Sequence, residues 1–183
     1  MRWRYASLIN AGFVTRHAAA TAWLSPTDAP AELDEIRDHL AIAVRYLREG
    51  YEGKVAVGDH DEAPLGAHNA ALAEMYLVQL EERRGEIKKA QSHLKSAAGL
   101  VISALSLLQE TNSSRKRAII REEYNMIKEW ASSRQVELPR PPEAILSLLA
   151  HPRDPISEGD LELLGTMAAL ERGEIGGPRK LNT

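Results

Sequence analysis

The chain has 183 residues and a formal net charge of −3; 44% of its residues are hydrophobic, 27% are charged and none is cysteine. This length and composition suit one folded domain, or one compact bundle with an appended piece, and exclude an intrinsically disordered chain. The absence of cysteine excludes a disulfide framework, a thiolate metal site and a cysteine nucleophile, and the slightly acidic balance is unlike that of a uniformly basic nucleic-acid-binding protein.

Two helices are predicted in the first third of the chain. The first covers residues 3–24 and is expected to turn its apolar side inward, namely Tyr5, Leu8, Ile9, Phe13 and Val14. The second begins near Pro30, which suits a first helical turn, and ends at Gly50. Its apolar stripe recurs every three or four residues, at Leu33, Ile36, Leu40, Ala43 and Leu47. Residues 51–66 are rich in glycine and acidic residues and are predicted to form a loop.

Residues 67–109 carry the strongest periodicity in the chain. Apolar residues recur at spacings of three and four, at Ile87, Ala90, Leu94, Ala97, Val101, Ala104 and Leu108. This heptad pattern continues upstream with one polar interruption at Arg83. We therefore predict one helix of about 40 residues, roughly 60 Å long at 1.5 Å per residue. The alternative is a break at Gly85, which would give a hairpin of two shorter helices.

The fold class that follows is all-α, a helical bundle built round this long central helix. Four polar residues at 111–114 can end this helix and cap the next one, over 113–133, so the two are expected to pack antiparallel. Prolines predict a stiff linker before a short helix over 143–150, and a capping box at Ser157 predicts a last helix that ends at Gly173. The expected domains are a main bundle over 1–133, a proline-rich linker over 134–141, a small helical appendage over 142–173 and a flexible tail over 174–183.

Side chains of the kinds that bind metals cluster after the second helix. They are Asp59, His60, Asp61 and, one turn into the following helix, His68. Carboxylates with imidazole could hold a divalent ion, but acidic residues before a helix also stabilise its N-terminus without a metal. The chain has no phosphate-binding loop, nucleophile elbow, His-Glu-x-x-His pair or dinucleotide fingerprint. We therefore predict no cofactor and no catalytic residue, with these four side chains as weak metal candidates.

Basic residues are concentrated between positions 83 and 121 and could contact phosphates. They are Arg83, Arg84, Lys88, Lys89, Arg115, Lys116, Arg117 and Arg121. Glutamates lie between them, so the helix faces carry mixed charge. Charge also alternates in blocks along the chain, which favours complementarity within one subunit or between subunits. Nucleic-acid binding, in a packaging or regulatory complex, is therefore the second hypothesis.

The sustained heptads favour a non-enzymatic helical assembly or adaptor subunit that packs against protein partners, above all further copies of itself. The predicted interaction seam consists of the seven apolar residues from Ile87 to Leu108. Since no window is apolar enough to cross a bilayer and no secretory signal is present, we expect a soluble protein of the cytoplasm or another reducing compartment, without a membrane partner. The first 27 residues contain arginine and no acid, a pattern also typical of mitochondrial transit peptides.

Overall fold

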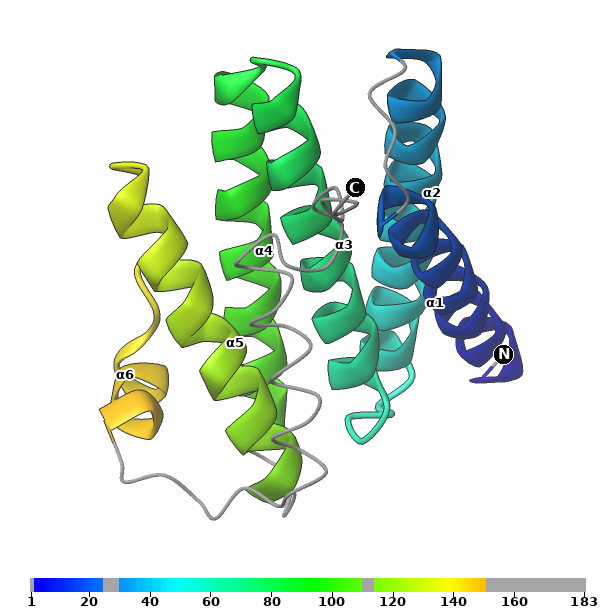
Figure 1. Ribbon diagram of the computed structural model, residues 1–183. Coiled ribbons are helices and arrows are strands. Elements are labelled where there is room, and N and C mark those ends of the chain that lie inside the picture. Colours follow the sequence, from blue (N-terminus) through cyan, green and yellow to red (C-terminus); the bar gives the residue numbers. More distant parts are fainter. Residues whose placement is uncertain (1, 25–29, 110–113, 151–183) are drawn as a thin grey trace, which may run out of the picture.

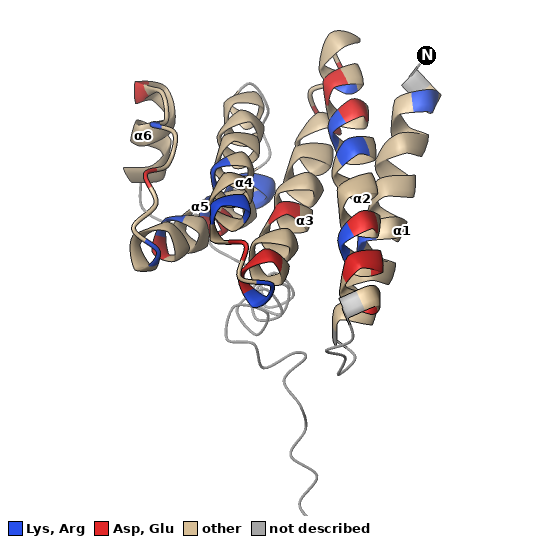
Figure 2. Ribbon diagram, turned by 90° about the horizontal axis from the view of Figure 1, so that it is seen from above, with Lys and Arg blue, Asp and Glu red and all other residues tan. Residues whose placement is uncertain are grey.

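The protein is a row of antiparallel helices. The computed structural model describes residues 2–24, 30–109 and 114–150, and these form helices without any strand. The helices are α1 (Arg2–Leu24), α2 (Pro30–Ala56), α3 (Ala63–Arg83), α4 (Ile87–Leu108), α5 (Ser114–Ser133) and α6 (Glu143–Ala150). From α1 to α5 each helix packs against the next one in the chain, α6 packs against α4, and α1 and α6 stand at opposite ends of the row (Figures 1 and 2). The predicted all-α bundle is confirmed.

Two groups of buried residues fill the space between the helices. The larger group is centred on α4 and includes Leu94 and Val101, with Ile127 contributed by α5. The smaller group lies between α1, α2 and α3 and includes Leu40 and Leu80. Because burying one large aliphatic side chain contributes about 1.5–3 kcal/mol, these two groups supply most of the driving force for folding. The predicted apolar stripe of α2 is buried along its whole length, and all of it except Leu33 belongs to these two groups.

The predicted single helix over 67–109 is wrong, because the chain reverses at Gly85 and α3 and α4 form a hairpin. Gly85 has a φ of +77°, a conformation that glycine adopts without the steric penalty of a Cβ atom. Its N–H donates to the carbonyl of Glu82 at 2.9 Å, and the N–H of Glu86 donates to that of Glu81 at 2.8 Å. This pair of bonds is a Schellman motif, which satisfies the last carbonyls of α3. The alternative of a break at Gly85 is therefore the correct one.

We expect Gly85→Ala to lower the free energy of unfolding by about 1 kcal/mol, because an L-residue is strained at positive φ. No heavy atom lies within 4 Å of the position its Cβ would occupy, so the loss would report backbone strain alone. Gln135 has a φ of 54° after α5 and provides the reverse substitution. Gln135→Gly should raise the stability by a smaller amount, since glycine also loosens the unfolded chain. Urea unfolding measures both changes in stability. A Gly85→Ala variant as stable as the unmodified chain would contradict the strain expected at this position.

The predicted end of the second helix at Gly50 is also wrong. α2 continues to Ala56, and the turn that ends it has Gly58 at a φ of +72°. Gly50 instead faces α1, where a Cβ would lie 2.6 Å from Cγ1 of Ile9 and 3.1 Å from the backbone oxygen of Tyr5. The missing side chain thus lets α1 and α2 approach closely, and the loop after α2 is shorter than predicted.

α5 and α6 complete the row near the bounds predicted for them. Ile145 of α6 is buried in the larger core group, so this short helix packs against the bundle. The predicted helix that ends at Gly173 and the predicted tail over 174–183 lie outside the described residues. The division into a main bundle and an appendage stays a prediction.

Candidate interaction surfaces

The predicted interaction seam on α4 is used within one chain. Ile87, in the first turn of α4, is 52% exposed. The other six residues are buried, namely Ala90, Leu94, Ala97, Val101, Ala104 and Leu108. They contribute to the larger core group together with residues of α2, α3, α5 and α6. A surface for a partner therefore has to be sought on other parts of the molecule.

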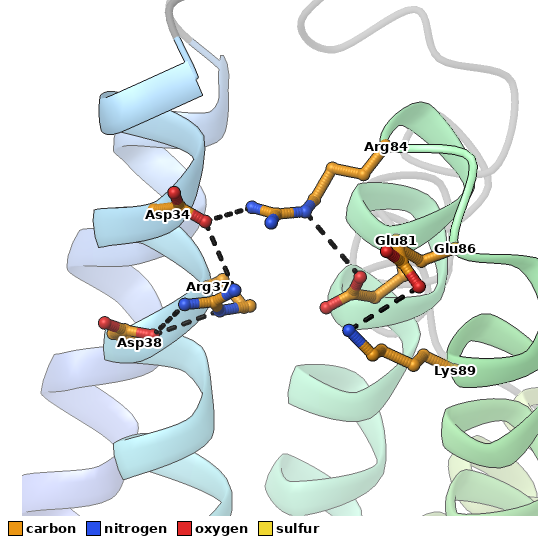
Figure 3. Close-up of polar contacts among 7 residues, drawn as sticks. All are labelled: Asp34, Arg37, Asp38, Glu81, Arg84, Glu86 and Lys89. Atoms are coloured by element: carbon orange, nitrogen blue, oxygen red, sulfur yellow. Dashed lines mark hydrogen bonds and ion pairs between the residues drawn. The ribbon is translucent and has the colours of Figure 1, made fainter.

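Several of the basic residues predicted to contact nucleic acid form ion pairs inside the chain. Arg84, which follows α3, bonds to Asp34 on α2 and has its Nε 3.8 Å from Oε2 of Glu81 (Figure 3). Lys89 on α4 lies 3.5 Å from Glu86. The Arg84 bridge joins two residues that are 50 positions apart in sequence and ties the end of α3 to α2. Charges that the sequence places in separate blocks thus meet within one molecule.

The remaining basic residues lie on α3, α4 and α5. The guanidinium of Arg83 stacks over the ring of Trp23 at 5.0 Å from its centroid. Lys116 donates to the backbone carbonyl of Asp61 at 2.8 Å. Of the other four, Arg117 is half-buried, Arg121 is buried, and Lys88 and Arg115 are exposed. The predicted phosphate contacts therefore do not form one continuous exposed patch.

The acidic residues after α2 surround a lysine. Lys54 is buried, and its Nζ lies 2.7 Å from Oδ2 of Asp59 and also contacts Glu62. Burial alone would lower the pKa of Lys54, but hydrogen bonds to the two carboxylates outweigh it and raise that pKa. His68 points elsewhere, toward Glu123 on α5. Within the described ranges, no three histidine, aspartate or glutamate side chains gather as metal ligands would. Of the other two candidates, His60 is half-buried and Asp61 is exposed.

A polar cluster that the sequence interpretation missed lies between α2, α3 and α4. Its centre is Glu74 on α3, which is 4% exposed. The carboxylate accepts hydrogen bonds from Ser96 at 2.5 Å and Arg48 at 3.0 Å, and Nδ1 of His93 lies 2.6 Å away. The signal in the sequence was an acid inside an otherwise apolar helical stretch over 70–78, since a buried carboxylate requires partners. The cluster joins three helices and is a structural site.

The pKa of Glu74 gives this cluster a pH dependence. Burial raises that pKa, but the hydrogen bonds from His93 and Ser96 and the charge of Arg48 together lower it below the ordinary value of 4.5. A carboxyl group with a depressed folded-state pKa stabilises the protein in full above its unfolded pKa, and the contribution is lost as the pH falls through the folded-state value. We expect the stability difference between the unmodified chain and Glu74→Gln to shrink as the pH falls below about 4.5. Urea unfolding from pH 6 to 3 measures it, and a difference that stays constant would contradict this assignment.

A second buried pair joins α3 to α5. Glu123 is fully buried, and its Oε2 lies 2.7 Å from Nδ1 of His68. Its other carboxylate oxygen has no hydrogen-bond partner among the described residues. Arg16 of α1 is close enough for its charge to interact with that of Glu123, although burial lowers the pKa of this arginine. The contact between His68 and Glu123 therefore joins α3 to α5 through buried polar groups.

The outer face of α1 is exposed at one end of the row. We define it as Trp3, Ser7, Asn10, Val14, Ala18 and Thr21, which follow one another at intervals of three or four and are all exposed. The prediction that Phe13 and Val14 turn inward is wrong, since they are 45% and 63% exposed. Trp3 is 87% exposed. Large apolar groups on a surface helix indicate a contact site when they lie together.

This outer face carries no charged side chain. In Figure 2, α1 is tan over most of its length, with blue near its N-terminus, whereas α2 carries bands of red and blue from its acidic and basic residues. The hydroxyls of Ser7 and Thr21 donate to the backbone carbonyls of Trp3 and His17, each at 2.9 Å. Because these hydroxyls already have acceptors, a partner could cover them at little cost in lost hydration.

Comparisons with known proteins add no functional information. No family model matches the chain, and neither a curated protein nor a solved structure matches it significantly. Among the residues that the structure describes, no helix is both long enough and apolar enough to cross a bilayer. Function therefore has to be argued from the surfaces of this chain alone.

Proposed function

We propose that the protein is a non-enzymatic helical assembly subunit that packs the outer face of α1 against another copy of the chain. One observation carries the proposal. Five large hydrophobic side chains are exposed among the described residues, and three of them, Trp3, Phe13 and Val14, lie on α1. In stacked helical arrays the terminal helix needs a polar outer face to stay soluble by itself. α1 stands at the end of the row with an uncharged outer face on which Trp3 and Val14 are exposed, and this favours a covering partner.

The distribution of charge supports a contact made by packing rather than by ion pairs. Among the exposed positions of α1 whose side chains the structure describes, Arg4 is the charged one, and it reaches back to Glu49 on α2 at 3.0 Å. No acidic residue occurs in α1. A strongly charged partner, such as a nucleic acid, would find little to bind on this face. A second uncharged helix face fits it better.

The test is sedimentation velocity on the full chain and on the double variant Trp3→Lys and Val14→Lys. We expect the unmodified chain to associate and the double variant to stay monomeric, because two lysines would have to be buried in the contact. Ile87→Lys is the matched control, since it changes an exposed hydrophobic residue outside α1 and should leave association unchanged. Thermal unfolding verifies that each variant is folded. A double variant that associates like the unmodified chain would overturn the proposal.

Nucleic-acid binding has weaker support from the arrangement of the basic residues, because Arg84 and Lys89 have carboxylate partners within the chain. It makes a distinct prediction, namely binding of a fluorescent duplex or single strand that weakens steeply with salt. Lys88→Glu with Lys89→Glu should weaken such binding, because it reverses two of the eight candidate charges. Salt-sensitive binding with this behaviour would favour the second hypothesis over assembly through α1.

A further inference from the structure

We infer that α1 pairs with α1 of a second copy in an antiparallel arrangement about a two-fold axis, an inference that rests on the proposed function. The outer face is bulky at its N-terminal end, where Trp3 lies, and small at its C-terminal end, where Ala18 and Thr21 lie. An antiparallel pair places the large residue of each copy against the small residues of the other. A parallel pair would bring two tryptophans together and leave a gap at the opposite end.

The spacing of the outer face is compatible with two-fold symmetry. In a two-fold contact, if one residue touches a second, the second also touches the first in the other half of the interface. An antiparallel register centred between Asn10 and Val14 satisfies this condition for the whole face. The contacts then repeat on both sides of the axis as Trp3 with Thr21, Ser7 with Ala18, and Asn10 with Val14.

The charges of α1 favour the same orientation. The N-terminus of α1 is the positive end of its helix dipole, and α1 itself contains no acid; Arg4, which lies near this end, pairs with Glu49 on α2. A parallel pair would bring two Arg4 side chains and two positive helix ends together. An antiparallel pair instead places the positive N-terminal end of each helix beside the negative C-terminal end of the partner's helix.

The position of α1 makes the contact geometrically simple. Because α1 ends the row, a second copy would continue it without displacing any helix (Figure 1). One helix of 23 residues per copy is roughly 34 Å long at 1.5 Å per residue. A contact limited to this length falls among the smaller protein interfaces, so we expect a dimer that dissociates on dilution.

The absence of cysteine allows a clean test by disulfide cross-linking of the full chain. Ser7→Cys and Ala18→Cys are prepared as separate single variants and oxidised alone and as an equal mixture. The antiparallel pair predicts no cross-link in either variant alone and a cross-linked heterodimer in the mixture, identified by its intact mass. A disulfide requires Cα atoms within about 7 Å, so positions 7 and 18 react only when they face each other.

The outcomes separate this inference from the proposed function. Efficient cross-linking of each variant with itself would show a parallel pair and overturn the antiparallel arrangement. If the mixture gives no heterodimer although sedimentation shows association, α1 does not pair with α1, and the inference fails while assembly stands. If the chain is monomeric throughout, both fail. Ser92→Cys, at an exposed position on α4, measures the background of random collisions.

Discussion

Glu74→Ala is expected to lower the free energy of unfolding by about 3 kcal/mol, the largest single effect that the structure indicates. The substitution removes the acceptor shared by Arg48, His93 and Ser96 and leaves these groups without it between three helices. Breaking a buried pair costs more than the pair contributes, because the remaining charge stays desolvated. We place the effect at the lower end of the usual range since Arg48 is partly exposed and can be hydrated.

Urea unfolding monitored by circular dichroism measures this loss. Glu49→Ala is the matched control, because its carboxylate pairs with Arg4 at the surface, where such pairs contribute about 0–1 kcal/mol. A Glu74→Ala variant no less stable than the Glu49→Ala variant would contradict the structural role of the cluster. The stability of Glu74→Gln should lie between those of Glu74→Ala and Glu49→Ala, since an amide keeps the size of the side chain and part of its hydrogen bonding.

Gly50→Ala is expected to lower the free energy of unfolding by about 2 kcal/mol, although alanine is the better helix former. Its Cβ would meet Ile9 and the backbone of α1, and backbone atoms cannot move aside without shifting the whole helix. Gly99→Ala on α4 is the control, because no heavy atom lies within 4 Å of its Cβ position. There the gain in helix propensity should raise the stability by about 0.5–1 kcal/mol.

If Gly50→Ala lowers the free energy of unfolding and Gly99→Ala raises it, α1 and α2 pack through a glycine contact. The comparison uses the same chemical change in two helices, so differences in the unfolded chain largely cancel. If Gly50→Ala stabilised the protein as Gly99→Ala is expected to, the close approach of α1 to α2 would be incorrect.

The heptad pattern predicted the buried residues of α3 and α4 but not the turn between them. Two helices of a hairpin that face one core repeat apolar residues with the same period as one straight helix. The two pattern positions that flank the turn, Arg83 and Ile87, are both exposed. Arg83 was visible as a polar interruption, whereas Ile87 fitted the pattern. Gly85 was the decisive residue, because a positive φ distinguishes a helix end from a glycine tolerated inside a helix.

At Gly50 the prediction failed in the opposite direction. This glycine was predicted to end a helix, whereas it lies inside α2 and allows close packing against α1. Its role depends on Ile9 and Tyr5, which are more than 40 residues away, so no local rule could reveal it. The inward assignment of Val14 failed for a related reason. An apolar residue on a helix at the end of a row has no neighbour to bury it, and the sequence does not state which helix comes last.

Little of the candidate site could be predicted, because the charge pairs join distant segments. Arg84 bonds to Asp34 across 50 residues, and Glu74 pairs with Arg48 across 26. Basic residues counted along the sequence therefore overstate the charge offered to a partner. The outer face of α1 did leave a signal, since no acid occurs in 23 consecutive residues of a chain in which 27% of residues are charged.

Assembly through an uncharged helix face is tested most directly by sedimentation equilibrium of the unmodified chain over a range of concentrations, at low and at high salt. We predict a molar mass that rises from the 20.2 kDa of one chain toward twice that value, to the same extent at both salt concentrations. A mass of one chain at every concentration would contradict the account. So would a dimer that dissociates at high salt, because it would be held by ion pairs rather than by the packing of α1.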